Sequence, residues 1–133
     1  MSLVRDGMLS DPAVLPGDTS VQEAAGHLTR PDVRAVLVVD AEGMLLGLVT
    51  PDSLVEHVLA AGLDPGSTAV SVAVVRAPLV LDADQLLDDG CRLLEEAELE
   101  RAPVVEQGRL VGVLSRSVVQ RRLAEDEPPP EDG

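Results

Sequence analysis

The sequence predicts an α+β fold made of two β-α-β-β-α repeats packed about a pseudo-two-fold axis. Three observations lead to it. The chain repeats itself at a nearly constant offset, both copies show strand-like and helix-like patterns in the same order, and one copy of about 50 residues is too small to bury both faces of its sheet. Two copies packed sheet to sheet would bury those faces and leave a crevice along the axis.

The internal repeat relates residues 11–59 to residues 76–124. The offset is 66 in the first part (78 − 12 = 66) and falls to 65 after a turn that is one residue shorter in the second copy (112 − 47 = 65). The matched pairs include Pro12 and Pro78, Val38 and Val104, Gly47 and Gly112, and Thr50 and Ser115.

The first copy begins with a short strand at 13–15 and a helix. Ser20 with Glu23 fits a capping box, and the apolar residues that follow recur at i, i+3, i+4 and i+7. These residues are Val21, Ala24, Ala25 and Leu28. The continuous apolar run at 35–39 predicts a buried strand.

A turn and a second helix complete the first copy. Residues 40–43 end in a glycine suited to positive φ, and the strand 44–49 follows. Thr50 is expected to cap the second helix, with Pro51 at its first position and Gly62 as its stop.

The second copy follows the same order. Its strands are expected at 79–81, 102–105 and 109–114, and Ser115 is expected to cap a helix that runs to about Leu123. The apolar stripe of its first helix consists of Leu87, Gly90, Cys91 and Leu94. We therefore place repeat 1 at 8–62, a linker at 63–71, repeat 2 at 72–125 and a disordered acidic, proline-rich tail at 126–133.

Composition excludes several classes of partner. The formal net charge is −14 and the chain has no Phe, Tyr or Trp, so neither phosphate neutralisation nor base stacking favours nucleic acid. The same charge disfavours anionic membranes, and no apolar run approaches 18 residues. We expect a cytoplasmic protein with an aliphatic core. All ten basic residues are Arg, which we interpret as bacterial codon bias.

No constellation for catalysis stands out, so we predict that the protein is not an enzyme and requires no cofactor. The single cysteine, Cys91, lies on the apolar stripe and is expected in the core rather than as a nucleophile. His27 and His57 have no companions at ligand spacing, so no metal site is expected. There is no glycine-rich phosphate loop, G-x-S-x-G or H-E-x-x-H motif.

Two motifs carry a resemblance to a known family. Gly47-Leu48-Val49-Thr50 and Gly112-Val113-Leu114-Ser115 each end a hairpin, and the second hairpin contains Pro103-Val104-Val105-Glu106. Two such copies in register resemble a tandem pair of cystathionine-β-synthase (CBS) domains, also called a Bateman module. The resemblance covers roughly residues 8–123. It implies a regulatory module whose crevice binds AMP, ADP, ATP or S-adenosylmethionine, and a homodimer.

The resemblance also implies site residues. The family holds ribose with a cap hydroxyl, matched by Thr50 and Ser115, and with an acid three positions later. Ser53 and Val118 stand at that acidic position, which favours the site of Thr50 and Ser53. Asp52 comes one residue early, a rotation of about 100° on a helix.

Arg101 matches the family's phosphate-facing basic residue. The equivalent position in the first copy is Ala35, with Arg34 next to it. Arg101 could instead be a surface partner of the acidic residues around it.

Two functions remain open. The chain could be a sensor of an adenosine-containing ligand that acts on a separate effector protein. The missing ribose acids favour the alternative, a degenerate pair that only dimerises or docks a partner.

Overall fold

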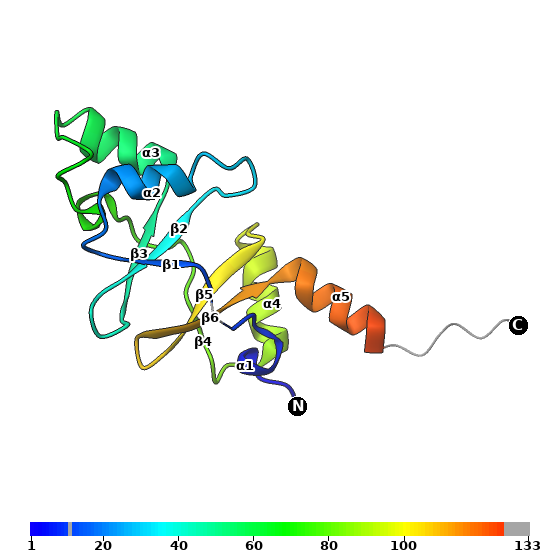
Figure 1. The fold of residues 1–133 in the computed structure, drawn as a ribbon. Coiled ribbons are helices and arrows are strands. Elements are labelled where there is room, and N and C mark those ends of the chain that lie inside the picture. The colour runs from blue at the N-terminus through cyan, green and yellow to red at the C-terminus, as the bar shows by residue number, and fades with distance from the viewer. Residues whose placement is uncertain (11, 127–133) are drawn as a thin grey trace, which may run out of the picture. The chain divides into compact units, whose positions relative to one another are not determined.

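The computed structural model of the chain describes residues 1–10 and 12–126, with side chains described up to residue 121. Within this part, two three-stranded sheets with strand orders β1-β2-β3 and β4-β5-β6 carry the helices (Figure 1). The predicted α+β class and the twofold β-α-β-β-α order are therefore confirmed.

The first sheet belongs to a compact unit formed by residues 12–78 with 107–110. In it β1 pairs parallel with β2, and β2 pairs antiparallel with β3. The elements are β1 Val14–Pro16, α2 Val21–His27, β2 Val36–Val39, β3 Leu45–Val49, α3 Pro51–Leu54, the π-helix η1 Val55–Leu59 and the 3-10 helix η2 Val70–Ala73. Strands and helices thus begin within one or two residues of the predicted positions.

The second sheet belongs to a unit formed by the described residues within 1–11, 79–106 and 111–133. Here β4 pairs parallel with β5, and β6 lies next to β5. The elements are α1 Val4–Gly7, β4 Leu81–Asp82, α4 Leu87–Glu96, β5 Arg101–Glu106, β6 Arg109–Ser115 and α5 Arg116–Asp126. The last helix extends three residues beyond the predicted end at Leu123.

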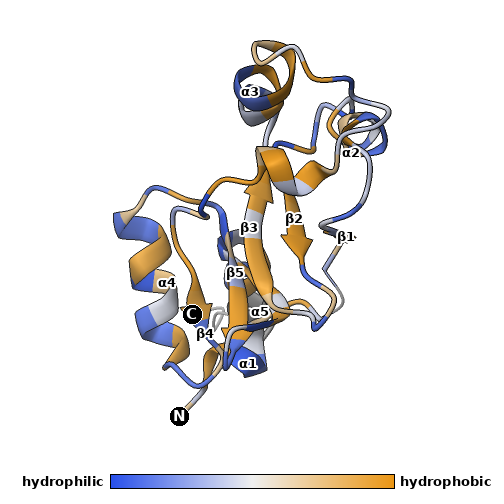
Figure 2. Ribbon diagram, turned by 90° about the vertical axis from the view of Figure 1, so that its left-hand side faces the viewer, coloured by the Kyte–Doolittle hydropathy of each residue, from blue (hydrophilic) through white to orange (hydrophobic). Residues whose placement is uncertain are grey.

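Each unit has its own aliphatic core. In the first, Val38, Val49 and Val58 are fully buried between the sheet and its helices. In the second, Leu81, Leu94 and Leu114 are the largest fully buried side chains. In Figure 2 the strands β2 and β5 are largely hydrophobic, and α4 carries both hydrophobic and hydrophilic residues around its turns.

Several local predictions are confirmed in the first unit. The Ser20 hydroxyl accepts the backbone N–H of Glu23 at 3.1 Å and so caps α2. In the turn, the Asp40 carboxylate accepts the N–H groups of Glu42 and Met44, and Gly43 has a φ of +82°. These contacts fix the β2-β3 hairpin, and β3 leads directly to Thr50.

Two short helices were not predicted, and each contributes to a core. Val4 of α1 is fully buried in the second unit, and Val70 of η2 is fully buried in the first. The two positions are related by the repeat offset (70 − 4 = 66). Residues 70–73 were expected to span the end of a linker and the start of repeat 2, so the core of repeat 1 extends past the predicted linker.

The extended segments after these helices add to the sheets in the same way. Leu9 exchanges backbone hydrogen bonds with Val113 of β6, at 2.8 and 3.0 Å, and Val75 does so with Leu48 of β3, at 2.9 and 2.8 Å. The segment that precedes each repeat in sequence therefore completes the sheet of the other repeat. The repeat limits 8–62 and 72–125 stay predictions. The two compact units have other limits, because they are defined by contacts in the structure.

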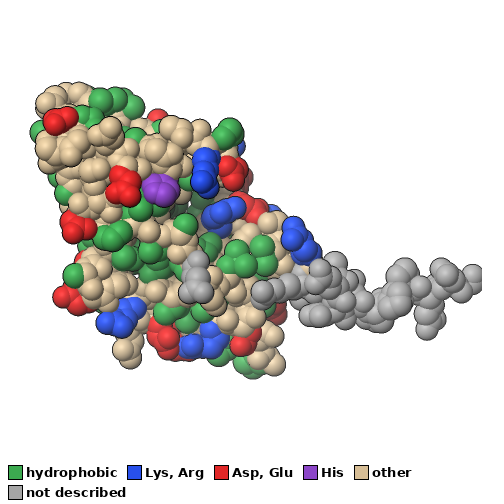
Figure 3. Space-filling view, in the orientation of Figure 1, with side chains coloured by type: hydrophobic (Ala, Val, Ile, Leu, Met, Phe, Trp, Pro, Cys, Tyr) green, Lys and Arg blue, Asp and Glu red, His purple; other side chains and the backbone are tan. Residues whose placement is uncertain are grey.

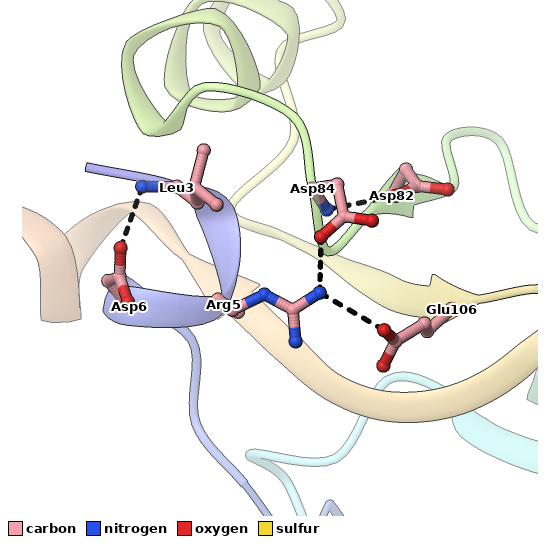
Figure 4. Close-up of polar contacts among 6 residues, drawn as sticks. All are labelled: Leu3, Arg5, Asp6, Asp82, Asp84 and Glu106. Atoms are coloured by element: carbon pink, nitrogen blue, oxygen red, sulfur yellow. Dashed lines mark hydrogen bonds and ion pairs between the residues drawn. The ribbon is translucent and has the colours of Figure 1, made fainter. Parts of the chain in front are cut away.

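An arginine holds the N-terminal segment in the second unit (Figure 4). The Arg5 guanidinium forms ion pairs with Asp84, which follows β4, and with Glu106 at the end of β5, the latter at 3.1 Å. The hydrogen bond from Arg5 to Asp84 is the largest of several contacts that raise the pKa of the guanidinium. Arg5 thus ties α1 to β5 and to the segment that follows β4.

Parts of the predicted organisation fall outside these observations. Of the tail 126–133, only Asp126 is described, as the last residue of α5, so the predicted disorder lies outside the described residues.

None of the helices that the structure describes has both the length and the apolar character needed to span a membrane. On the face shown in Figure 3, acidic and basic side chains are interspersed with hydrophobic ones.

Candidate functional site

An open groove lies in the first unit, where the loop after α2 meets the start of α3. Its volume is about 550 Å³, within the range of small-molecule sites. Its lining residues are Leu28, Thr29, Arg30, Pro31, Val33, Arg34, Thr50, Pro51 and Asp52. The groove therefore combines aliphatic walls, two hydroxyls, two guanidinium groups and one carboxylate.

Thr50 caps α3, as the sequence predicts. Its hydroxyl accepts the backbone N–H of Ser53 at 3.0 Å, and the Ser53 hydroxyl accepts the backbone N–H of Thr50 at 2.9 Å. Pro51 occupies the first helical position, where its missing N–H is harmless. In this reciprocal bond the Thr50 hydroxyl oxygen acts as an acceptor, and its O–H donates to no other residue in the described part of the chain.

Ser53 faces the protein interior rather than the groove. It is only 3% exposed, and its hydroxyl donates to the Thr50 carbonyl at 3.0 Å as well as accepting the Thr50 N–H. Its hydrogen-bonding capacity is thus used within the cap. Thr50 and Asp52 line the groove and Ser53 does not, and the expected role of Ser53 as a ligand contact stays a prediction.

Asp52 is exposed and lines the groove beside Thr50. The sequence argument placed it about 100° away from the family's acidic position. The groove extends from the start of α3 to the loop of residues 28–34, and Asp52 lines it from the first turn of α3. Asp52 is the one acidic residue among those that line the groove.

Two guanidinium groups flank the groove on the loop after α2. Arg30 and Arg34 are both exposed and line it, and among the described residues neither forms an ion pair. An unpaired arginine is a ready donor to phosphate or carboxylate oxygens. Sequence reasoning noted Arg34 only as a neighbour of Ala35 and did not consider Arg30.

The equivalent place in repeat 2 is arranged differently. Ser115 is the last residue of β6, is buried, and donates its hydroxyl to Glu100 Oε1 at 3.2 Å. The same oxygen accepts the backbone N–H of Ser117 at 3.0 Å. The expectation that the Ser115 hydroxyl caps the last helix is corrected in this respect, because the Glu100 carboxylate receives the free N–H of the first turn.

Hydrogen bonding from Ser117 is the main reason that the pKa of Glu100 is lowered below its ordinary value. Bonds to a carboxylate stabilise its charged form, so Glu100 stays ionised to lower pH than a free glutamate. No local sequence pattern indicates this contact, because Glu100 and Ser117 are 17 residues apart.

Two further predicted positions of repeat 2 lie in the second unit. Arg101 is exposed at the start of β5, and no ion pair joins it to another described residue, so its phosphate role stays a prediction. Val118, at the family's acidic position, is half-buried in α5.

Cys91 is half-buried against the second core, as its place on the apolar stripe predicts. Burial raises the pKa of its thiol, which disfavours the reactive thiolate. In the part of the chain that the structure describes, no group of three His, Cys, Asp or Glu side chains could hold a metal ion.

Comparison with known proteins identifies the family. The model of the CBS domain matches twice, over residues 4–60 and 70–125. The chain belongs to the CBS domain family. The two matches begin 66 residues apart, at α1 and near η2, so this tandem CBS pair includes the two short helices that the sequence argument missed.

The chain is similar to several curated CBS proteins. It is 30% identical to the CBS domain-containing protein YhcV of Bacillus subtilis over 115 residues, which cover 86% of this chain and 81% of YhcV. It is also 30% identical to the Arabidopsis thaliana protein CBSCBSPB3, over 80% of this chain. The CBS pair spans only about a fifth of that plant protein, 19% of its length.

Among solved structures, the CBS pair is similar to CBSX2, whose crystal structure is described as a complex with AMP. The two share 28% sequence identity and superpose with a TM-score of 0.74 over 94% of this chain and 98% of that one.

Proposed function

We propose that this CBS pair is a regulatory module that binds an adenosine-containing ligand in the groove of its first repeat. The observation that carries the proposal is the lining of that groove. The Thr50 hydroxyl and the Asp52 carboxylate lie beside two arginines that are unpaired among the described residues, against aliphatic walls.

Each part of the groove suits one part of such a ligand. Leu28 and Val33 offer apolar surface to an adenine ring, which needs no aromatic partner if backbone groups read its edge. The Asp52 carboxylate could accept both ribose hydroxyls, in charge-assisted bonds of about 1.5–3 kcal/mol each. Arg30 and Arg34 would then face the phosphate or the charged end of the ligand.

The family supports the ligand class. CBSX2, at 28% identity, is described with AMP bound. AMP, ADP, ATP and S-adenosylmethionine share the adenosine group and differ in the charged end, so they form the natural test set. None would serve as a required cofactor, and we propose regulation rather than catalysis because no nucleophile and base converge among the described residues.

Calorimetric melting against these four ligands tests the proposal. A ligand at 100 times its dissociation constant should add about 2.7 kcal/mol of stability, which is several degrees for a domain of this size. Calorimetry is needed because the chain has no Trp or Tyr.

Asp52→Asn should weaken the ligand that binds by about ten-fold or more, because the two ribose bonds lose their charge. The matched control is Glu56→Gln on η1, an exposed acid of the same helical segment that does not line the groove. Equal weakening by both changes would contradict a specific role for Asp52.

The phosphate contact can be assigned by comparing AMP with adenosine. Arg34→Ala should weaken AMP and leave adenosine nearly unaffected. Loss of AMP and adenosine to the same degree in this variant would remove Arg34 from the phosphate site.

Regulation would follow from a ligand that favours one conformation over another. We propose a homodimer whose arrangement the ligand shifts, acting on a separate effector protein. A change in sedimentation or in small-angle scattering on adding the ligand would report this shift directly.

A specific observation also favours the alternative, a pair that only dimerises or docks a partner. Val55 and Leu59 on η1 are 54% and 62% exposed, and Leu63 just beyond is 40% exposed. Apolar side chains exposed four residues apart can form a contact surface. Melting that responds to none of the four ligands, with a dimer that persists at low concentration and is lost in Leu59→Ser, would establish this second function.

A further inference from the structure

The repeat offset relates two residues of opposite charge. Glu100 corresponds to Arg34 (100 − 34 = 66), and Ser117 corresponds to Asp52 (117 − 52 = 65). The first pair comes just before the second strand of each repeat, and the second pair lies in the first turn of the helix after the third strand. The two repeats therefore place opposite charges at equivalent positions.

In repeat 1 these positions border an open groove. Arg34 has no ion-pair partner among the described side chains, and the Asp52 carboxylate accepts no hydrogen bond from another described residue, although the Asp52 backbone carbonyl accepts the N–H of Val55. Both charged groups therefore remain free to contact a ligand.

In repeat 2 the hydrogen-bond donors at the equivalent position are already bound by a carboxylate of the chain itself. One oxygen of Glu100 accepts both the Ser117 N–H and the Ser115 O–H, at 3.0 and 3.2 Å. The Glu100 backbone carbonyl also accepts the N–H of Arg116, at 2.8 Å, which fixes the residue against the start of α5. A negative group is favoured at this end of an 11-residue helix.

We propose that Glu100 is a built-in anion that closes the second repeat to ligands, so that the chain binds one adenosine-type ligand, in repeat 1. The number of ligands rests on the function proposed above, whereas the closure by Glu100 rests only on its own contacts. A ligand that used the Ser115 hydroxyl and the Ser117 amide would have to displace Glu100 from both. An incoming phosphate would also meet a negative charge where repeat 1 offers Arg34.

A titration with AMP, followed by calorimetry and by amide signals of the ¹⁵N-labelled full chain, tests the binding part. We expect one AMP per chain, with shifts at Thr50 and Asp52 and none at Ser117. Arg34→Glu, which gives repeat 1 the charge of repeat 2, should weaken AMP by at least about ten-fold, because like charges then face each other. Its control is Arg92→Glu on α4, which is outside the groove. Two AMP molecules per chain, or a Ser117 shift as large as that of Asp52, would overturn the proposal.

A pH titration without ligand tests the closure on its own. The Ser117 amide signal should follow the ionisation of Glu100, with a midpoint below that of an ordinary glutamate. The transition should vanish in Glu100→Gln and persist in the control Glu95→Gln, an exposed acid on α4 without a hydrogen bond to Ser117. A Ser117 signal that titrates unchanged in Glu100→Gln would refute the built-in anion.

The two arms separate the two failures. If AMP does not bind the wild-type chain but the Ser117 amide signal follows the ionisation of Glu100, the function proposed for AMP fails and the closure of repeat 2 stands. If AMP binds repeat 1 but the Ser117 amide signal does not follow the ionisation of Glu100, the proposed function stands and the closure of repeat 2 fails.

Discussion

The backbone carbonyl of Val75 packs against Gly47 so closely that a β-carbon at position 47 would overlap its oxygen. Gly47 also has a φ of +146°, which side-chain-bearing residues rarely adopt. In repeat 2, a β-carbon at Gly112 would come within 2.6 Å of the Leu9 carbonyl oxygen. The glycine of each Gly-x-x-Thr/Ser motif thus admits the extended segment that completes the sheet.

Gly47→Ala should therefore destabilise the protein, by about 1–3 kcal/mol, because the segment around Val75 must move or strain. The control is Gly26→Ala in α2, where a β-carbon meets nothing within 4 Å. That change should stabilise the helix slightly, by about 0.4–1 kcal/mol. Chemical denaturation of the two variants measures both effects, and a Gly47→Ala protein as stable as wild type would contradict the close packing.

Ser53→Ala should lower stability by about 0.5–2 kcal/mol, the usual cost of a lost helix cap contact. The change removes the acceptor of the Thr50 N–H and a donor to the Thr50 carbonyl, both in a buried site. Ser71→Ala is a suitable control, since Ser71 is exposed and its hydroxyl bonds to no described residue. Equal melting temperatures for the two variants would indicate that Ser53 does not support the cap.

Glu100 should make stability depend on pH in a defined direction. Its pKa is lowered in the folded state, so its contribution is fully present above the pKa of an unfolded glutamate and is lost as pH falls through the lower folded value. Glu100→Gln should therefore cost stability at neutral pH and nothing at the acid end of that window. Thermal melts of wild type and variant between neutral pH and the acid limit of folding should show their melting temperatures converging as pH falls. A difference in melting temperature that stays constant with pH would contradict this role of Glu100.

Arg5→Ala should lower the melting temperature, because Asp84 and Glu106 lose the cation that joins them to α1. The difference from wild type should shrink as salt is raised, since the Debye length falls from about 10 Å at 0.1 M to about 3 Å at 1 M. Arg92→Ala, whose ion pairs with Asp89 and Glu96 stay within α4, should have a smaller effect. An effect of Arg5→Ala that does not depend on salt would point to lost packing instead.

Much of the fold could be predicted because its signals are local. The cap at Thr50, the turn at Asp40–Gly43 and the apolar stripes follow from spacing within a few residues. The helices α1 and η2 were missed because four residues show no periodicity. A signal did exist, since the repeat continues upstream and relates Val4 to Val70 and Leu9 to Val75 at the same offset of 66.

The candidate site was less predictable, because its decisive features depend on which way side chains turn. Ser53 was assigned to the ligand by its position three residues after Thr50, yet that spacing also closes a reciprocal cap and turns it inward. Arg30 lines the groove from a loop without a pattern. The contact of Glu100 with Ser117 joins two elements, and no local pattern reports such a contact.

The crossed segments described above bear on how the chain is made. Leu9 must wait for Val113, which leaves the ribosome 104 residues later (113 − 9 = 104), before it finds its place in a sheet. At about 5–20 residues per second, that delay is roughly 5–20 s. Throughout synthesis of the first repeat, Val4 therefore has no core to enter, and the N-terminal segment can take its native place only after the second repeat has been synthesised.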